Sequence, residues 1–301
     1  MSTTTLVMAW IASAFVLVVV LVTMSVWYSR RKRGRVEGYE GLARTDRYIR
    51  WIRIGIVFIA ATTVFLLLKN QLDFATALLA PAVWSFIVII GLVALDFAAL
   101  ARPSGPRVKR HLSVYLPTRL IVVSLLIVAV LGVIVWYAQR EATFDQVSYL
   151  VVWVKDGHTQ WATRSPFAAW GYTYPLLKLL GVVLLTAIVA VFAVLRRPQY
   201  LPAEEFSLLD RGFRRRTIKD ILVAFTACLA ASTGIVAGNI CWTVNSIGPD
   251  NIERTAVIVG SGAIAVWMFV TTCWCLANLL LLPPLEEDWR AGLGRKPPKK
   301  K

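Results

Sequence analysis

The sequence is poor in the residues on which most enzyme sites depend. It has two histidines, four cysteines and 17 acidic residues among 301. His111 and His158 both lie outside the long apolar runs, so no run carries the histidine that a buried haem or an intramembrane serine–histidine pair requires. The chain also lacks HExxH, GxxxxGK[ST] and CxxC patterns. We therefore expect no enzymatic activity, no cofactor and no bound metal.

The cysteines are confined to the last two apolar runs, at Cys228, Cys241, Cys273 and Cys275. This placement excludes an extracellular domain held together by disulfides. Two thiols spaced as CxC on a helix point about 200° apart. Buried cysteines that behave as small hydrophobic residues are therefore favoured over a redox pair or a soft-metal site.

Apolar residues, by contrast, are abundant and arrive in blocks. They make up 57% of the chain, and the mean hydropathy is +0.64. Blocks of roughly 20 residues match the thickness of a bilayer, inside which the backbone must be helical. The sequence therefore predicts an all-α membrane protein, a seven-transmembrane-helix bundle whose spans are 5–28, 51–68, 79–101, 120–138, 174–195, 220–244 and 256–282.

The charges predict how these spans are threaded. With the N-terminus outside and the C-terminus cytoplasmic, 27 of the 33 lysines and arginines fall on the cytoplasmic side, as the positive-inside rule requires. The first run precedes its basic cluster and is too long for a signal-peptide core, so we expect an uncleaved anchor. The net charge of +16 is then a topology signal that favours anionic inner-leaflet lipid over nucleic acid.

The predicted organisation is a single membrane domain over 1–289, followed by a basic disordered tail over 290–301. The one large external segment is 139–173, where Asp156-Gly157 predicts a hairpin with strands near 149–155 and 158–163. Trp153, Trp161 and Trp170 are its candidate external platform, either for a ligand or as an aromatic lid at the headgroup level.

The loop 196–219 is the most structured of the predicted cytoplasmic segments. Pro202-Ala-Glu-Glu is typical of a helix start, and Phe206, Leu209 and Phe213 then fall on one face. We expect an amphipathic helix, lying under the bilayer or packed on neighbouring loops, which a cytoplasmic partner could bind.

Asp96 is the one acid well inside an apolar run. An intramembrane carboxylate is costly unless it is paired or hydrated. Arg119 begins the next span, so a candidate ion pair between Asp96 and Arg119 would clamp two helices at the cytoplasmic boundary. A proton relay and a lone hydrated acid are the alternatives.

Small residues predict where two helices approach closely. Ala230, Gly234 and Gly238 form a ladder at four-residue spacing in one run, and Gly260 and Gly262 lie in the next. Such residues favour tight packing between the last two helices of one chain over packing between two copies of the chain.

One further sequence pattern bears on the source of the protein. The pattern Arg102-Pro103 with Tyr115-Leu116-Pro117-Thr118-Arg119, followed by LRRP and LLDRGFRRRT over 195–217, is similar to uncharacterised multi-pass membrane proteins of actinobacteria. It covers about half of the chain. The resemblance implies a bacterial plasma (cell) membrane and no particular activity.

Two functional hypotheses follow. The first is a membrane subunit of a transport or export assembly, which a polar path lined by Thr62, Thr63, Asp96 and Asn278 would support. The second is a non-catalytic envelope sensor or scaffold, which a closed bundle with an exposed aromatic patch would support. The sequence specifies no oligomeric state.

Overall fold

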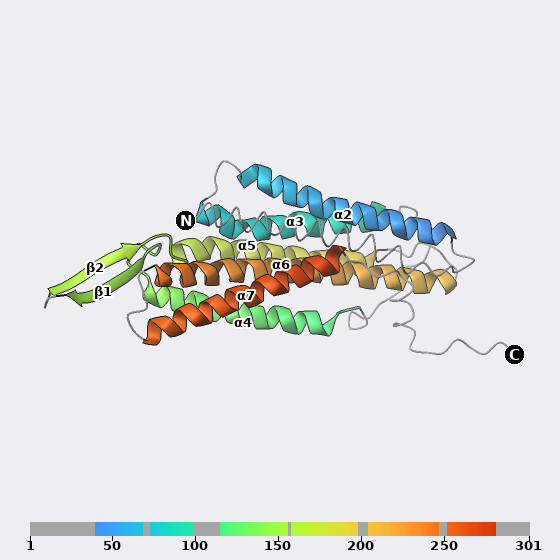
Figure 1. Cartoon of the computed structure of the whole chain (residues 1–301). Helices are drawn as coiled ribbons and strands as arrows, with labels where there is room; N and C mark the ends of the chain where they lie inside the picture. The colour runs from blue at the N-terminus through green and yellow to red at the C-terminus, as the bar shows by residue number, and fades with distance from the viewer. Residues whose placement is uncertain are drawn as a thin grey trace.

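A computed structural model describes residues 40–68, 73–98, 115–155, 158–197, 204–246 and 252–280. Within these residues the protein is a bundle of six helices with one two-stranded sheet (Figure 1). In chain order the elements are α2 (Glu40–Leu68), α3 (Phe74–Ala98), α4 (Thr118–Glu141), β1 (Tyr149–Lys155), β2 (His158–Arg164), α5 (Trp170–Arg196), α6 (Glu204–Asn245) and α7 (Ile252–Leu280).

All six helices are long and apolar enough to cross a membrane, which is what a multi-pass membrane protein requires. Five of the predicted spans, 51–68, 79–101, 120–138, 174–195 and 256–282, overlap α2, α3, α4, α5 and α7. Helix α2 begins 11 residues before its predicted span, at Glu40, and the other ends differ by at most five residues. The predicted span 5–28 and the tail 290–301 lie outside the described residues. The count of seven spans and the orientation of the chain across the membrane therefore remain predictions.

Helix α6 is the centre of the bundle. In its apolar segment 78% of the residues are buried, whereas the corresponding share in the other five helices is 11% to 33%. Helices α3, α4, α5 and α7 all pack against α6, while α2 packs mainly on α3. Figure 1 shows this order, with α2 and α3 on one side of α6, α4 on the other, and α7 crossing obliquely.

The prediction of a separate amphipathic helix in 196–219 is wrong in one respect. A helix does begin after Pro202, at Glu204, but it continues without a break to Asn245. Phe213 is buried against Ile49 and Leu95, so this part of α6 packs on α2 and α3. Burial on neighbouring helices outweighs the weak amphipathic signal, because packing decides helix placement more strongly than the local pattern does.

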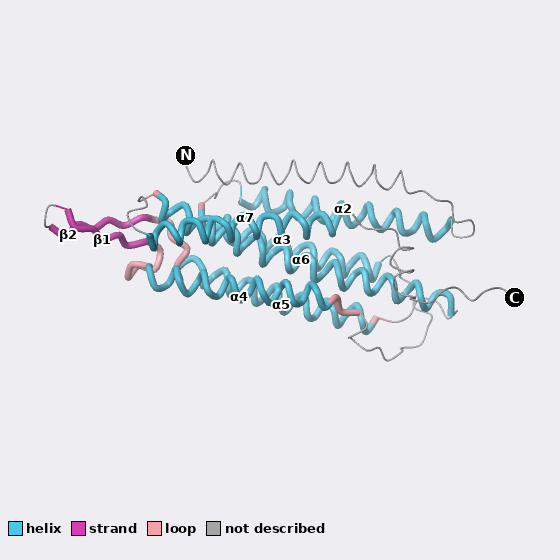
Figure 2. The backbone as a smooth tube through the Cα atoms, turned by 60° about the horizontal axis from the view of Figure 1, so that its bottom comes forward, coloured by secondary structure: helices cyan, strands magenta, loops and turns pink. Residues whose placement is uncertain are grey.

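The hairpin is where the sequence placed it, and it extends beyond one end of the bundle (Figure 2). Its strands are antiparallel, with Tyr149 opposite Arg164 and Lys155 opposite His158. The segment that follows ties it down, because Asn239 and Thr243 of α6 both donate hydrogen bonds to the carbonyl oxygen of Pro166, at 3.1 and 3.3 Å. We call this end of the bundle the hairpin end and the opposite one the distal end.

Candidate functional site

A buried polar network joins four helices near the distal end. Asp96 of α3 forms an ion pair with Arg197, the residue that ends α5, at 2.5 Å. Arg53 of α2 forms a second ion pair, with Asp220 of α6, at 2.6 Å. All four side chains are at most 5% exposed. Each carboxylate is therefore neutralised by a guanidinium, which is the condition under which buried charge is tolerated.

Thr217 connects the two ion pairs. Its hydroxyl donates to Asp96 Oδ1 at 3.1 Å and accepts a hydrogen bond from Arg53 Nη2, also at 3.1 Å. Because it both accepts and donates, this one hydroxyl links α2, α3 and α6 through a continuous set of polar contacts. The network has the form of an interhelix clamp.

Two of the buried arginines also cap helix ends. Arg197 Nη1 donates to the Asp96 carbonyl oxygen at 3.3 Å, within the last turn of α3. Arg214 Nη1 donates to the carbonyl oxygens of Val194 and Leu195 at 2.5 and 3.3 Å, within the last turn of α5. The last four carbonyls of a helix have no partner inside it, and a cation there complements the negative end of the helix dipole. This explains why more arginine than aspartate is buried here.

The network lies near one edge of the apolar region. Asp220 and Trp242 are about 33 Å apart along α6 at 1.5 Å per residue, which is close to the ~30 Å of bilayer hydrocarbon. Trp242, Trp136 and Trp170, near the hairpin end, are all exposed, as tryptophans at a headgroup boundary are. The ion pairs therefore lie toward the opposite end of this apolar region from these tryptophans.

The predicted pair of Asp96 with Arg119 is wrong. Arg119 lies in the exposed first turn of α4, and Asp96 is paired with Arg197 instead. The reason is helix order, because α3 and α4 pack on α6 rather than on each other. Consecutive helices are usually neighbours, and here the central helix intervenes.

The sequence does not identify Arg53, Arg197, Thr217 and Asp220 as one network. Basic residues near span ends are typical topology signals, and Thr217 has no distinguishing pattern. One clue was present. Arg53 falls inside the predicted span 51–68, and Asp220 is the first residue of the predicted span 220–244. An arginine and an aspartate at the same end of two apolar runs are candidates for a pair, although the sequence does not say which runs are adjacent.

The residues that would line a transport path do not converge. Thr62 is exposed on α2, and Asp96 is held in the network. Asn278 donates to the carbonyl oxygen of Trp274, one turn earlier in its own helix, at 2.9 Å. Most of the buried apolar side chains form instead one cluster around α6.

Helices α6 and α7 approach each other at three of the predicted glycines, most closely at Gly234 and Gly262. A Cβ on Gly234 would lie 3.2 Å from Met268 Cβ, and one on Gly238 would lie 3.9 Å from Ala265 Cβ. A Cβ on Gly262 would lie 3.3 Å from Cys241 Sγ. Ala230 is fully buried. Gly260 is the exception, because a Cβ there would meet nothing within 4 Å. The structure therefore gives Gly260 no role in the packing of α7 on α6.

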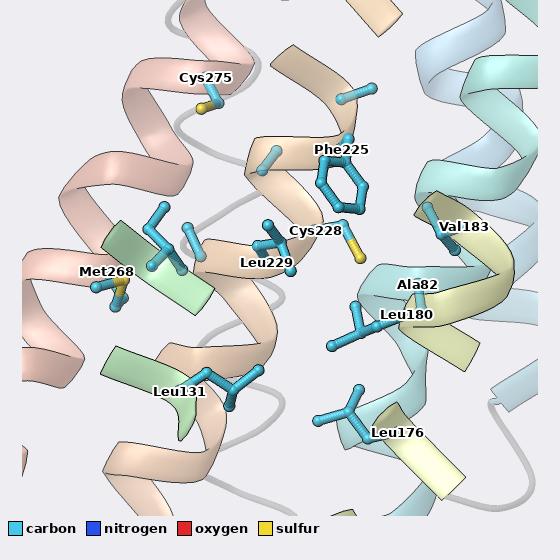
Figure 3. Packing of buried hydrophobic residues seen from close by; sticks show 14 of the residues in the cluster. Ala82, Leu131, Leu176, Leu180, Val183, Phe225, Cys228, Leu229, Met268 and Cys275 are labelled. Atoms are coloured by element: carbon cyan, nitrogen blue, oxygen red, sulfur yellow. The ribbon is translucent and has the colours of Figure 1, made fainter. Parts of the chain in front are cut away.

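Two of the four cysteines, Cys228 and Cys275, are apolar core residues, and Cys241 and Cys273 are partly exposed. Figure 3 shows Cys228 directed from α6 toward Leu180 of α5 and Ala82 of α3, whereas Cys275 comes from α7 on another side of α6. All four thiols are free. Among the described residues no group of histidine, cysteine, aspartate and glutamate is arranged to hold a metal ion.

Two exposed tryptophans of the hairpin end, Trp161 and Trp170, lie on different elements. Trp161 is 70% exposed on β2, while Trp170 stacks on Tyr174 at the start of α5 with ring centroids 5.0 Å apart. Trp161 is opposite Val152 and Trp153 is opposite Gln160, so the two tryptophan positions fall on opposite faces of the ladder. The side chain of Trp153 lies outside the described residues.

The turn before β1 is held by a single carboxylate. Asp145 accepts hydrogen bonds from the backbone N–H groups of Val147 and Ser148, each at 3.1 Å, and from the hydroxyl groups of Ser148 and Thr143. The Thr143 hydroxyl, followed by the backbone donors, lowers the pKa of Asp145 to about 2. Beside the turn, Tyr149 packs on Phe167 with ring centroids 5.1 Å apart. Burial, together with the nearby Glu141 charge, raises the pKa of Tyr149.

Comparison of the chain with protein-family models, with curated proteins and with solved structures found no match.

Proposed function

We propose that the chain is a non-catalytic sensor or scaffold of a bacterial plasma membrane, related to the actinobacterial proteins that it resembles. In this proposal 5–28 is a seventh span, the N-terminus and the hairpin are outside, and the distal end faces the cytoplasm. The helical bundle then acts as a rigid support between an external hairpin and basic cytoplasmic segments.

The observation that supports this role is the apolar interior around α6. Buried apolar side chains from α2, α3, α4, α5 and α7 fill it, and Figure 3 shows one region of this packing. Some of its hydroxyl groups bond between helices, as when Ser85 of α3 donates to the Ala224 carbonyl oxygen of α6 at 3.1 Å. Ser124 and Thr226 bond each other at 2.8 Å. A predominantly apolar interior suits a support better than a conduit for polar substrates.

The transport-assembly hypothesis keeps one supporting observation. Helix α6 begins at Glu204, whereas its apolar segment begins at Gly212. The helix therefore continues about 12 Å beyond that segment at 1.5 Å per residue. Such an extension within 196–219 is a suitable docking point for a cytoplasmic subunit.

A pull-down of the full-length protein from its native membrane in nanodiscs separates the two functions. The sensor or scaffold proposal expects an envelope or regulatory protein to co-purify and expects Trp161→Ser to reduce its recovery. The matched control is Trp267→Ser, which changes an exposed tryptophan of α7. A stoichiometric nucleotide-hydrolysing subunit that both variants retain would overturn the proposal in favour of transport.

A further inference from the structure

Three side chains form a stack on the exposed side of α5, at the hairpin end. Trp170 stacks on Tyr174 with ring centroids 5.0 Å apart, and Lys178 Nζ lies 4.1 Å from the centroid of the Tyr174 ring. The three residues follow each other at four-residue spacing, so they share one face of the helix. All three are exposed. We call them the α5 stack.

The ammonium group of the α5 stack has a fixed place but no counter-ion. Lys178 forms no ion pair with any described residue. A tyrosine ring attracts a cation through its quadrupole, which orients the ammonium without neutralising its charge. Because a charge on an apolar helix is costly unless it is paired or hydrated, this position favours an anion.

The α5 stack lies at the edge of the apolar region. Figure 1 shows α5 beginning where the hairpin meets the bundle, and exposed tryptophans such as Trp170 mark a headgroup boundary there. The Lys178 side chain points back toward the start of the helix, since its Nζ contacts the ring of Tyr174. Tyr174 is only about 6 Å from Trp170 along the axis, at 1.5 Å per residue. The ammonium therefore lies close to the level of the lipid phosphates.

An exposed apolar strip continues from the stack along the same face of α5. Gly181, Leu185 and Ile188 follow Lys178 at three-, seven- and ten-residue spacing. Leu185 and Ile188 are 62% and 45% exposed, and a Cβ on Gly181 would meet nothing within 4 Å. The axial distance from Tyr174 to Leu185 is about 16 Å, close to half of the ~30 Å of bilayer hydrocarbon. The strip therefore has the length of an acyl chain in one leaflet.

We propose that the α5 stack binds the phosphate of an anionic phospholipid in the leaflet at the hairpin end, with an acyl chain along Gly181 and Leu185. The Lys178 ammonium supplies the positive charge, and the Trp170 indole and the Tyr174 hydroxyl are further hydrogen-bond donors on the same face. A phospholipid fits better than free phosphate, because the cation adjoins an apolar strip. The site requires only that α5 be in a bilayer and does not depend on the sensor or scaffold role.

Binding of this lipid would fasten the hairpin to the membrane surface. The first turn of α5 is bonded to the turn before β1, because the Gly171 N–H donates to the Gln146 carbonyl oxygen at 2.9 Å. The two backbones are close there, since a Cβ on Gly171 would lie 2.8 Å from that oxygen. A lipid held by the α5 stack therefore fixes the part of the helix to which the hairpin is attached.

Photocrosslinking of the full-length protein in nanodiscs tests the site. Phosphatidylcholine discs carry a trace of phosphatidylglycerol or, separately, of phosphatidylcholine, each with a diazirine midway along one acyl chain. Mass spectrometry of peptides then locates the adducts. We expect phosphatidylglycerol to label residues 181–188 about fivefold more than phosphatidylcholine does. Val266 and Val270 of α7, which are exposed apolar positions without a neighbouring lysine, should be labelled equally by both lipids.

Substitutions at Lys178 distinguish a charge-dependent site from an ordinary lipid-facing surface. Lys178→Gln should remove the excess labelling by phosphatidylglycerol, and Lys178→Arg should retain it. Arg140→Gln, which changes an exposed cation of α4 at the hairpin end, is the matched control and should also retain it. Because both side chains are exposed, helix content and thermal unfolding of the three variants should match the wild type.

Three results would contradict the proposal. Equal labelling of 181–188 by the two lipids in the wild type would make the strip an ordinary lipid-facing surface. An unchanged excess in Lys178→Gln, or an equal loss in Arg140→Gln, would show that the α5 stack does not select the lipid. Loss of the excess on addition of millimolar inorganic phosphate would make this a site for free phosphate.

Discussion

The two ends of the bundle are stabilised in different ways. At the distal end, ion pairs between residues more than 100 positions apart connect α2, α3, α5 and α6. At the hairpin end, Asp145 bonds residues within three positions of itself, and Trp161 and Trp170 are exposed. The comparison indicates that the distal end sets how the helices are arranged, whereas the hairpin end is a locally folded attachment.

The largest effect is expected from breaking the clamp at Asp96. Asp96→Asn leaves the buried guanidinium of Arg197 without its carboxylate, and loss of one partner of a buried pair costs about 3 kcal/mol. Thermal unfolding in detergent should show this loss, while Arg119→Gln on the surface should change stability by less than ~0.5 kcal/mol. A variant that keeps its stability but loses activity would show that Asp96 is a relay.

A smaller effect is expected where α7 meets α6, between the two ends. Gly234→Leu forces a side chain against Met268 and Ala265, and overpacking of this kind costs about 2 kcal/mol. Gly260→Leu is the control, because that position has open space around it. Equal losses for both variants in thermal unfolding would contradict the packing described here.

The substitution Thr217→Val tests whether the two ion pairs of the distal end act as one network. It removes the hydroxyl that joins the two ion pairs and leaves both pairs in place, so we expect a loss of about 1 kcal/mol. In a double-mutant cycle with Asp96→Asn, the two losses should not add, because both residues belong to one network. Additive losses would mean that the ion pairs act separately.

The smallest effect concerns pH at the hairpin end. Folding lowers the pKa of Asp145 from 3.8 to about 2, so its contribution to the turn is complete above the unfolded value and is lost as pH falls through the folded one. Hydrogen exchange of the Val147 and Ser148 amides should be slow at pH 5 and should lose its protection between about pH 4 and pH 2. In Asp145→Asn this step should be absent while the helices stay folded.

Much of the fold was determined by the sequence itself. Apolar runs of bilayer length must form helices, because no other backbone arrangement satisfies its own hydrogen bonds in hydrocarbon. Asp156-Gly157 between alternating residues specified the hairpin, and its two strands were found within one residue of their expected ends. The contact of α6 with α7 was also predictable from the sequence. Small residues recur at four-residue spacing in α6 and are present in α7, and such residues permit two helices to approach closely.

Only the tertiary structure decided which helices are neighbours. Arg53, Asp96, Arg197 and Asp220 are ordinary span-end residues in the sequence, and nothing local says that Asp96 faces Arg197 rather than Arg119. That choice follows from α6 taking the centre and separating α3 from α4. Lateral order among helices arises from side-chain packing and polar pairing summed over the whole bundle, whereas each helix is specified by its own hydropathy.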